Sequence, residues 1–334
     1  MQSAPAGTTT VSESDREAAF DELGDVAGRI VESVEQVIEG KPDVIKVALT
    51  VLLAGGHLLI EDVPGVGKTM LSKALARSID CTVRRVQFTP DLLPSDITGV
   101  SVFNQETHDF EFRPGAVFAN VVVGDEINRA SPKTQSALLE CMEERQVTVD
   151  STTYLLPPPF IVIATQNPIE MEGTYPLPEA QRDRFTARVS MGYPSASSEL
   201  EMLEAHGARS PLDHLKPVTD AETVVRLTET VSRVHLSDPV KEYAIALTAA
   251  TRRNADLRLG ASPRATLHLV RAGRAWAALA GRDYVLPDDL QVLAIPVLAH
   301  RLIPSAEAHI ARRSTESVVE NVLRSVPVPS RTRR

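Results

Sequence analysis

The segment Glu61–Leu71, which reads EDVPGVGKTML, decides the fold predicted for this chain. It matches the phosphate-loop pattern G-x-x-x-x-G-K-[ST] except at its first position, where Asp62 replaces glycine. A short apolar stretch, HLLIED, leads into the segment, and TMLSKALARSI follows with apolar residues at helical spacing. Because a phosphate loop requires a strand before it and a helix after it, this context predicts a nucleotide site.

An aspartate at position 62 is compatible with such a loop. Asp62 precedes the residues expected to surround the phosphates, and aspartate tolerates left-handed backbone angles better than most side chains do. We expect its carboxylate to point away from the phosphates and to accept hydrogen bonds from nearby N–H groups. The alternative, for the loop taken alone, is a chance GxGKT sequence.

Backbone N–H groups of the loop and the positive end of the following helix would hold a triphosphate. Lys68 would reach the β- and γ-phosphates, and the Thr69 hydroxyl would bind Mg²⁺. The predicted nucleotide-binding residues of the loop are Val63, Pro64, Gly65, Val66, Gly67, Lys68, Thr69 and Met70.

The composition is that of an ordinary globular protein. The 334 residues are 43% hydrophobic and 24% charged, and this length suggests about two domains. A net charge of −9 argues against a general nucleic-acid binder, which usually carries a basic surface. Cys81 and Cys141 belong to no metal or redox motif, so we expect both to be reduced core residues. No secretory signal or membrane-spanning stretch is recognisable, which predicts a cytoplasmic protein without membrane insertion.

Buried strands alternate with helices over the first part of the chain. Besides HLLIED, the stretches TVRRVQF, FANVVVGDE and FIVIATQNP read as strands, and SPKTQSALLECMEER reads as a helix. This alternation predicts an α/β fold with a parallel sheet and a site at the carboxyl ends of its strands. From about Ser195 onward we expect the strands to stop and helices to follow.

Four parts follow from this reading. Residues 1–14 are predicted to be a disordered tail and residues 326–334 a loose one. Between the tails, residues 15–194 would form the α/β nucleotide-binding core, and residues 195–325 a smaller, all-helical domain.

A second motif, VVVGDE, ends an apolar strand with Asp125 and Glu126. One acid could support Mg²⁺, and the next could orient and deprotonate an attacking water. The alternative explanation is a strand that simply ends in solvent-exposed acids. It explains a single acid better than two acids downstream of a phosphate loop. We therefore predict Asp125 and Thr69 as metal ligands and Glu126 as the catalytic base.

Four further polar residues are candidates whose ordinary explanations stay open. Asn167 ends IVIATQNP, where its amide could contact the γ-phosphate or the water, or could simply be a turn residue. In PEAQRDRF, Arg182 and Arg184 could stabilise phosphoryl charge in a neighbouring subunit, or could pair with nearby acids at the surface. Arg264, in GASPRA, could sense the γ-phosphate and close the second domain over the nucleotide, or could be a surface arginine.

With these motifs in order, the chain resembles the MoxR family of AAA+ ATPases over nearly its whole length. The most specific stretches are FTPDLLPSDITGV, FRPGAVFANVVVGDEINRASPKTQSALLECMEERQVT, IATQNPIEMEGTYPLPEAQRDRF and GASPRA. The resemblance implies Walker A at Gly65–Thr69, Walker B at Asp125 and Glu126, sensor 1 at Asn167 and sensor 2 at Arg264. It implies the arginine finger at Arg184; an additional arginine at position 182, where the family usually has an apolar residue, departs from the pattern.

The resemblance also implies how such a protein works. An insert at about residues 94–120 and a hairpin near ERQVTVDSTTYLL would face the pore or top of a ring, which is usually a hexamer. Members are chaperone-like, use ATP and Mg²⁺, and act with von Willebrand factor A-domain proteins. This chain contains no D-x-S-x-S adhesion motif, so such a partner would be a separate polypeptide.

Two other functions are considered beside a ring ATPase. A DNA motor or clamp loader is disfavoured by the acidic charge balance and by the lack of an appended DNA-binding module. A nucleotide-gated scaffold with little turnover is disfavoured by the intact Glu126. GTP preference is disfavoured because no N-K-x-D motif is present, and Ile38 and Gly40 are weak candidates for an adenine pocket.

Overall fold

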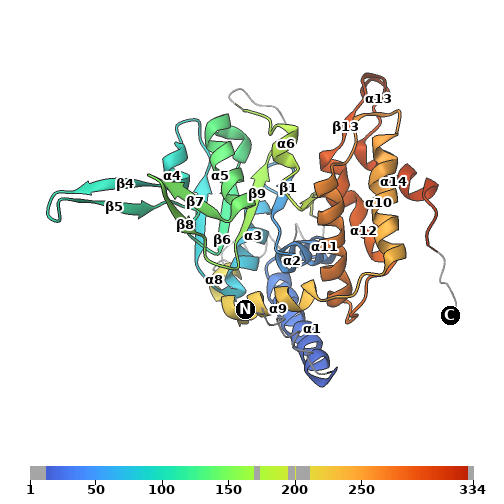
Figure 1. The fold of residues 1–334 in the computed structure, drawn as a ribbon, viewed down its shortest axis with the longest axis horizontal. Coiled ribbons are helices and arrows are strands. Elements are labelled where there is room, and N and C mark those ends of the chain that lie inside the picture. Colours follow the sequence, from blue (N-terminus) through green and yellow to red (C-terminus); the bar gives the residue numbers. More distant parts are fainter. Residues whose placement is uncertain (1–12, 169–173, 195–199, 201–210, 330–334) are drawn as a thin grey trace, which may run out of the picture.

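The computed structural model describes residues 13–168, 174–194, 200 and 211–329. Its centre is a five-stranded sheet, with helices on its faces and a further group of helices beside it (Figure 1). The predicted tails fall mostly outside the described residues, although α1 (Glu13–Glu35) already includes the last two positions of the predicted amino-terminal tail.

The sheet is parallel throughout, as predicted. In spatial order its strands are β10 (Ala187–Val189), β1 (Leu58–Glu61), β9 (Ile161–Gln166), β6 (Val121–Asp125) and β3 (Val83–Gln87). Four of them match the predicted apolar stretches. The edge strand β10 was not predicted, because three residues that include Arg188 are too short and too polar to give a strand signal.

Alternate residues of each strand enter two separate hydrophobic cores. Val121, Val123 and Ile163 join one cluster, whereas Val122 and Val162 join the other. The first cluster lies under α1, α2 (Pro42–Leu53) and α3 (Lys68–Arg77), and the second under α5 (Pro132–Glu144). Helices cover both faces, which is the arrangement that a fully parallel sheet requires.

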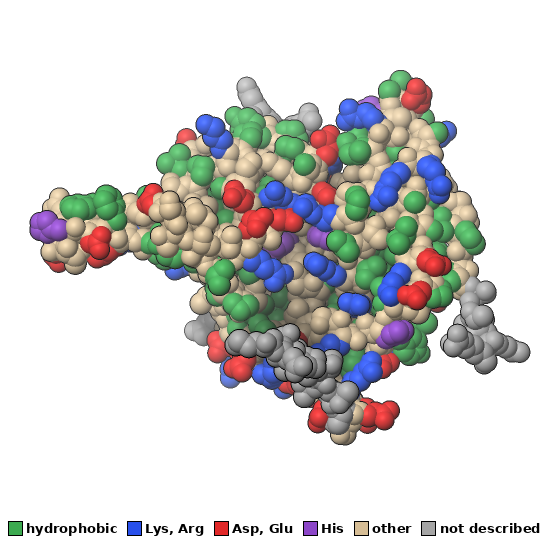
Figure 2. All heavy atoms as spheres, viewed as in Figure 1, with side chains coloured by type: hydrophobic (Ala, Val, Ile, Leu, Met, Phe, Trp, Pro, Cys, Tyr) green, Lys and Arg blue, Asp and Glu red, His purple; other side chains and the backbone are tan. Residues whose placement is uncertain are grey.

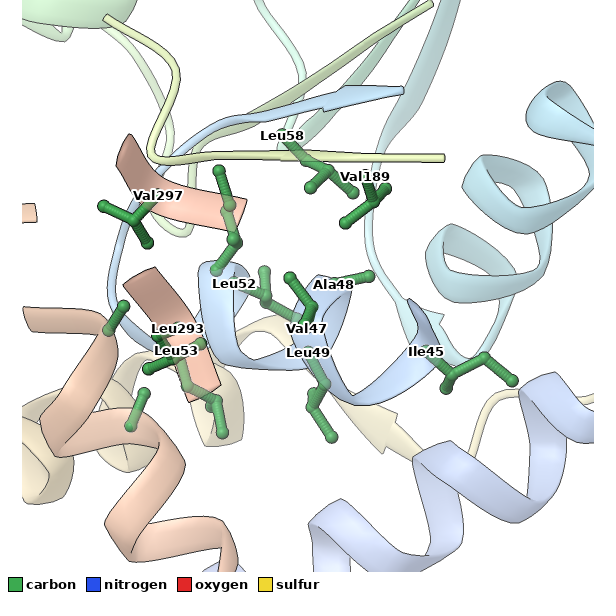
Figure 3. Close-up of a cluster of buried hydrophobic side chains, with 14 of the residues drawn as sticks. Ile45, Val47, Ala48, Leu49, Leu52, Leu53, Leu58, Val189, Leu293 and Val297 are labelled. Atoms are coloured by element: carbon green, nitrogen blue, oxygen red, sulfur yellow. The ribbon is translucent and has the colours of Figure 1, made fainter. Parts of the chain in front are cut away.

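Helix α2 joins the sheet to the carboxyl-terminal helices. In the close-up its side chains lie between Leu58 and Val189 of the sheet and Leu293 of α12 (Pro287–Leu298) (Figure 3). Eight of its twelve residues are buried, which explains why its sequence is apolar all round rather than amphipathic.

Two antiparallel hairpins are inserted in the sequence between elements of the α/β core. The strands β4 (Gly99–Asn104) and β5 (Asp109–Pro114), after the short α4 (Pro94–Thr98), form a hairpin that projects far from the body (Figure 1). It lies within the range predicted for an insert. The second hairpin, β7 (Gln146–Val149) with β8 (Thr152–Leu155), lies where the second hairpin was predicted.

The carboxyl-terminal part is mainly helical, as expected. Its principal helices are α9 (Ala221–Ser232), α10 (Asp238–Arg252), α11 (Pro263–Leu279), α12 and α14 (Thr315–Ser325). Its shorter described helical elements are α8 (Pro211–His214), α13 (Ala306–Ile310) and the 3-10 turn Ala299–Arg301, and those of the core are α6 (Glu179–Arg182) and the 3-10 turn Ile127–Arg129.

The prediction that strands stop at about Ser195 was wrong in detail. The two-residue β11 (Thr219–Asp220) pairs with β2 (Ile79–Asp80), and β12 (Leu257–Leu259) pairs with β13 (Ile303–Pro304). These strands are too short for periodicity to detect. Helix α9, which follows β11, packs against α1, α2 and α11. The helices α10 to α14, called the lid below, form the separate group beside the sheet.

A buried ion pair joins the lid to the core. The Arg301 side chain is only 1% exposed, and its Nη1 donates to Asp183 at 2.5 Å. The same guanidinium donates to the Phe185 carbonyl and to His268 Nδ1. Ser262, which caps α11, donates its hydroxyl to the Asp183 carboxylate at 2.9 Å. A charge removed from water is tolerated only when it is paired and hydrogen-bonded in this way.

A second buried polar residue, His57, ties three elements together at the amino end of β1. Its Nδ1 accepts a hydrogen bond from Val162 N at 3.0 Å, and its Nε2 donates to the Met142 carbonyl at 3.0 Å. Both ring nitrogens are thus used by the neutral form. Burial lowers the pKa of His57 to about 4, an effect that the Met142 hydrogen bond only partly opposes.

This pKa predicts an acid-sensitive fold. The unfolded chain binds a proton at His57 below about pH 6.5, whereas the folded chain does so only near pH 4, so stability should fall as pH decreases through this window. Relative to His57→Gln, which does not titrate, the parent should lose up to about 3 kcal/mol of unfolding free energy. Urea unfolding at several pH values measures this difference, and parallel curves for the two proteins would contradict it.

Candidate nucleotide-binding site

The predicted phosphate loop lies between β1 and α3, where its backbone is open toward solvent. Gly65 and Gly67 adopt φ values of 86° and 88°, in the left-handed region that favours glycine. Gly67 is also the N-cap residue of α3, so N–H groups without a helical partner lie at the positive end of the helix. The two glycines therefore give the loop the geometry that receives an anion.

Asp62 has the role that its position suggested. Its Oδ1 accepts a hydrogen bond from Val63 N at 2.8 Å, and its Oδ2 accepts from Ser190 Oγ and from Gly192 N, both at 2.6 Å. The carboxylate is used by these donors rather than turned into the loop. Burial raises the pKa of Asp62, but the hydrogen bonds outweigh burial and leave the pKa below its ordinary value. Asp62 thus fastens the start of the loop to the segment after β10.

Lys68 spans the loop. Its Nζ donates to the backbone carbonyls of Asp62 and, at 3.1 Å, of Gln166. Burial lowers its pKa, and the carboxylates of Asp62, Glu126 and Asp125 oppose that shift from a distance. An ammonium group that is held only by neutral carbonyls gains a stronger partner when a phosphate arrives.

Thr69 and Asp125 meet as a candidate magnesium site. The Thr69 hydroxyl donates to Asp125 Oδ1 at 2.9 Å, and Asp125 also accepts from Arg85 Nε at 2.7 Å. The described residues contain no group of three or more His, Cys, Asp or Glu side chains that could hold a metal. Mg²⁺ usually keeps several waters and phosphate oxygens, so one hydroxyl and one carboxylate are a sufficient protein contribution. The oxygen donors therefore fit Mg²⁺.

Glu126 lies beside this pair, at the exposed end of β6. Its backbone is left-handed, with φ at 57°, and its N–H donates to Thr165 Oγ1 at 3.0 Å. Its carboxylate accepts from Arg129 Nη1 at 2.9 Å and from Gln87 Nε2 at 3.3 Å. Sequence reasoning missed Arg85 and Gln87, whose contacts depend on the order of the strands, and Arg129, whose contact with Glu126 is local at a spacing of three residues. The polar alternation in TVRRVQF was the available signal for the first two.

Asn167 directly follows β9, next to the end of β6. Its backbone carbonyl accepts a hydrogen bond from Asn128 Nδ2 at 3.1 Å, which ties it to the segment after Glu126. Lys68, Asp125, Glu126 and Asn167 therefore gather at the carboxyl edge of the sheet.

The predicted adenine residues lie near this edge. Ile38 is buried and Gly40 has a left-handed backbone. The next residue, Lys41, donates to the Tyr193 carbonyl at 3.1 Å, close to the Gly192 that binds Asp62. Their role in base binding stays a prediction.

Arg184 and Arg264 lie at the opposite edge. Arg184 precedes β10, which runs parallel to β1, so it is at the amino end of the strands. Arg264 Nη2 contacts Glu143 at 2.9 Å and its Nη1 is 3.9 Å from Asp183. Within one chain the structure does not bring Arg264 to the phosphate loop, contrary to expectation. The lid docks at the amino edge through Asp183 and Arg301, which sequence patterns could not reveal.

Comparisons with known proteins agree with this architecture. The profile of the ATPase family associated with various cellular activities (AAA) matches residues 57–187, and that of the AAA lid domain matches residues 249–322. The chain is 49% identical to the uncharacterized protein YeaC of Bacillus subtilis (strain 168), covering 92% of this chain and 97% of that protein. It is 41% identical to the chaperone MoxR1 of Mycobacterium tuberculosis, in an alignment that covers 90% of this chain and 82% of MoxR1.

A solved structure is also similar. That of a presumed ATPase from Cytophaga hutchinsonii superposes with a TM-score of 0.87 at 39% identity, covering 95% of this chain and 99% of that one. Among the described residues, no helix is both long and apolar enough to cross a membrane.

The contacts of Asp62 generate a prediction that opposes the consensus pattern. Asp62→Gly restores the pattern's first glycine but leaves the N–H groups of Val63 and Gly192 without their acceptor. We expect it to lower the free energy of unfolding by about 1–3 kcal/mol. Asp62→Asn, which keeps one carbonyl acceptor, should lose less. Urea unfolding without nucleotide measures both, and a glycine variant as stable as the parent would refute this role.

Proposed function

Since the chain belongs to the MoxR family of AAA+ ATPases, we propose that it hydrolyses ATP between the subunits of a hexameric ring. The energy would drive chaperone-like remodelling or maturation of protein complexes, together with a von Willebrand factor A-domain partner. The observation that carries the proposal is the division of the charged residues between two opposite edges of one sheet.

The carboxyl edge would bind and activate the reactants. Lys68 and the loop N–H groups would bind the phosphates of ATP, and Thr69 and Asp125 would hold Mg²⁺. The ion would neutralise phosphate charge when bound. Glu126, whose side chain is 43% exposed, is open enough to orient a water and take its proton. Asn167 is close enough in the fold to help position that water.

The amino edge would complete the neighbouring subunit's site. Arg184 lines an open surface hollow beside α5, where it is accessible to another chain. The guanidinium of Arg264 lies in the same region. Arg145 and Arg271 also lie close together. The pKa of Arg145 is lowered, mainly by burial and further by the charge of Arg271. A guanidinium group at an exposed edge suits the charge on a transferred phosphoryl group. In a ring with head-to-tail contacts, this edge meets the next carboxyl edge.

The long hairpin would contact the protein that is remodelled. Phe103 and Phe110 are 48% and 68% exposed, with ring centroids 5.3 Å apart. Figure 2 shows hydrophobic, acidic and histidine side chains together at the projecting end of the hairpin. Exposed aromatic pairs on a projecting arm are features of protein-binding surfaces rather than of solvent-facing strands. The name of the relative MoxR1, a chaperone, is in keeping with this role.

Mixing two inactive variants tests whether each active site is shared. Lys68→Ala removes the carboxyl-edge cation and Arg184→Ala the amino-edge one, and each should lower turnover by roughly 10³-fold or more. Random mixed rings contain about one interface in four with both residues intact, so an equal mixture should recover about a quarter of parent turnover. Mg·ATP turnover per protomer should also rise with protein concentration.

The control mixture combines Lys68→Ala with Glu126→Gln. Both changes lie on the same edge, so no interface regains an intact site and the mixture should stay inactive. If the first mixture also stays inactive while light scattering shows assembled rings, the shared-site mechanism is wrong. If Glu126→Gln alone keeps full turnover, the base assignment fails, and parent protein that binds ATP without turnover would favour the scaffold function.

A further inference from the structure

A chain of polar contacts leads from the phosphate loop to a helix of the lid. Lys68 Nζ donates to the Gln166 carbonyl at 3.1 Å, and the Gln166 side-chain amide donates to the Glu61 carboxylate. The other oxygen of Glu61 accepts from Arg188 Nη1 at 2.7 Å. Arg188 Nη2 in turn donates to Glu316. The nucleotide site and the lid are thus joined by consecutive hydrogen-bonded residues, and Gln166 contributes its backbone carbonyl to one link and its side chain to the next.

The backbone holds each step of this chain in place. Glu61 and Gln166 are paired neighbours at the ends of β1 and β9, and Arg188 lies opposite Leu59 on the edge strand. Glu316 is in the first turn of α14. The buried face of α14 packs against α10 and α12, so its position follows that of the lid.

Arg188 is suited to link two carboxylates. The Arg188 side chain is 22% exposed and the Glu61 side chain is 21% exposed. The ion pairs of Arg188 with Glu61 and with Glu316 are therefore both partly shielded from water. The planar guanidinium uses one terminal nitrogen for each acid, which a lysine ammonium on the same strand could not do with the same geometry. Arg188 is not among the residues that contact the loop directly, and no step of ATP hydrolysis described above uses it.

The end of β9 should differ between nucleotide states. Without a phosphate, Lys68 is bound to the Gln166 carbonyl. A bound γ-phosphate would compete for Lys68 and would engage Asn167, the residue next to Gln166. A ligand shifts a conformational equilibrium only through contacts that differ between the two states, and these contacts differ at the residue that starts the chain.

We propose that Arg188 is a positioning residue that couples the γ-phosphate site to the lid, through Gln166 and Glu61 on one side and Glu316 on the other. This rests on the proposed ATPase function. The lid would then change its position as ATP becomes ADP, and movement imposed on the lid would in turn alter the geometry of Gln166 and Asn167. Coupling between sites is reciprocal, so both directions follow.

Hydrogen exchange of α14 in the full-length protein tests the coupling. Exchange is compared with Mg·ADP and with the slowly hydrolysed Mg·ATPγS, in the parent, Arg188→Met and Glu316→Gln. The matched control is Glu320→Gln, one turn further along α14, whose ion pair is with Arg324 of the same helix. We expect a nucleotide-dependent difference of about 5-fold or more in the parent and the control, and near equality in the other two.

Two further readouts separate coupling from a merely structural ion pair. The Arg188→Met/Glu316→Gln double variant should behave like either single variant, because both remove the same link. For the single variants, kcat should fall while KM for ATP stays within about twofold. If Glu316→Gln lowers thermal stability but keeps the nucleotide-dependent exchange of α14, or if the parent binds both nucleotides without any such difference, the coupling is refuted.

The ATPase proposal fails separately. It fails if the parent does not bind Mg·ATPγS, or if parent turnover survives Lys68→Ala. The coupling is judged from parent protein that binds both nucleotides, so the two failures are distinct results.

Discussion

Parallel pairing of β1, β9 and β6 is the constraint on which the rest of the structure depends. The register pairs Glu61 with Gln166 and Gly124 with Ala164, so the three strands end at nearly the same level. Every residue that leaves these ends enters the same space. The loop lysine, the two acids after β6 and the asparagine after β9 meet there although they are far apart in sequence. No side-chain interaction is needed to bring them together, because the backbone ladder does so.

The same pairing keeps other charged residues away from that space. A residue just before a parallel strand lies at the opposite edge, about the length of the strand away, which is roughly 3.3 Å per residue. Arg184 and Arg264 are therefore separated from their own loop by the sheet itself. Side-chain rotation does not close such a distance. The catalytic arginine that we propose at this edge would serve a nucleotide only in another chain, so activity would then require assembly.

How far the sequence predicts this structure depends on the range of each interaction. The three central strands β1, β9 and β6 and helix α2 were predictable because burial on all sides demands near-continuous apolar runs. The direction of the Asp62 carboxylate was predictable from local backbone preferences, but Ser190 and Gly192 as its partners were not, since they lie more than a hundred residues away. The docking of Arg264 was not predictable, because periodicity defines α11 without stating which edge of the sheet it meets.

The lid is attached to the core by apolar contacts and by two ion pairs, and these attachments differ in how readily they yield. Apolar contacts between α2 and the lid are non-directional, so they permit sliding. The Asp183–Arg301 pair is directional and almost fully buried, and breaking it would leave a charge without a partner or water. The Arg188–Glu316 pair is directional as well, but Glu316 is 37% exposed, so water can replace the lost contact. A lid held in this way should rotate about Asp183 and Arg301 rather than detach. The largest displacement would then fall on the side of the lid that meets the strands next to the phosphate loop.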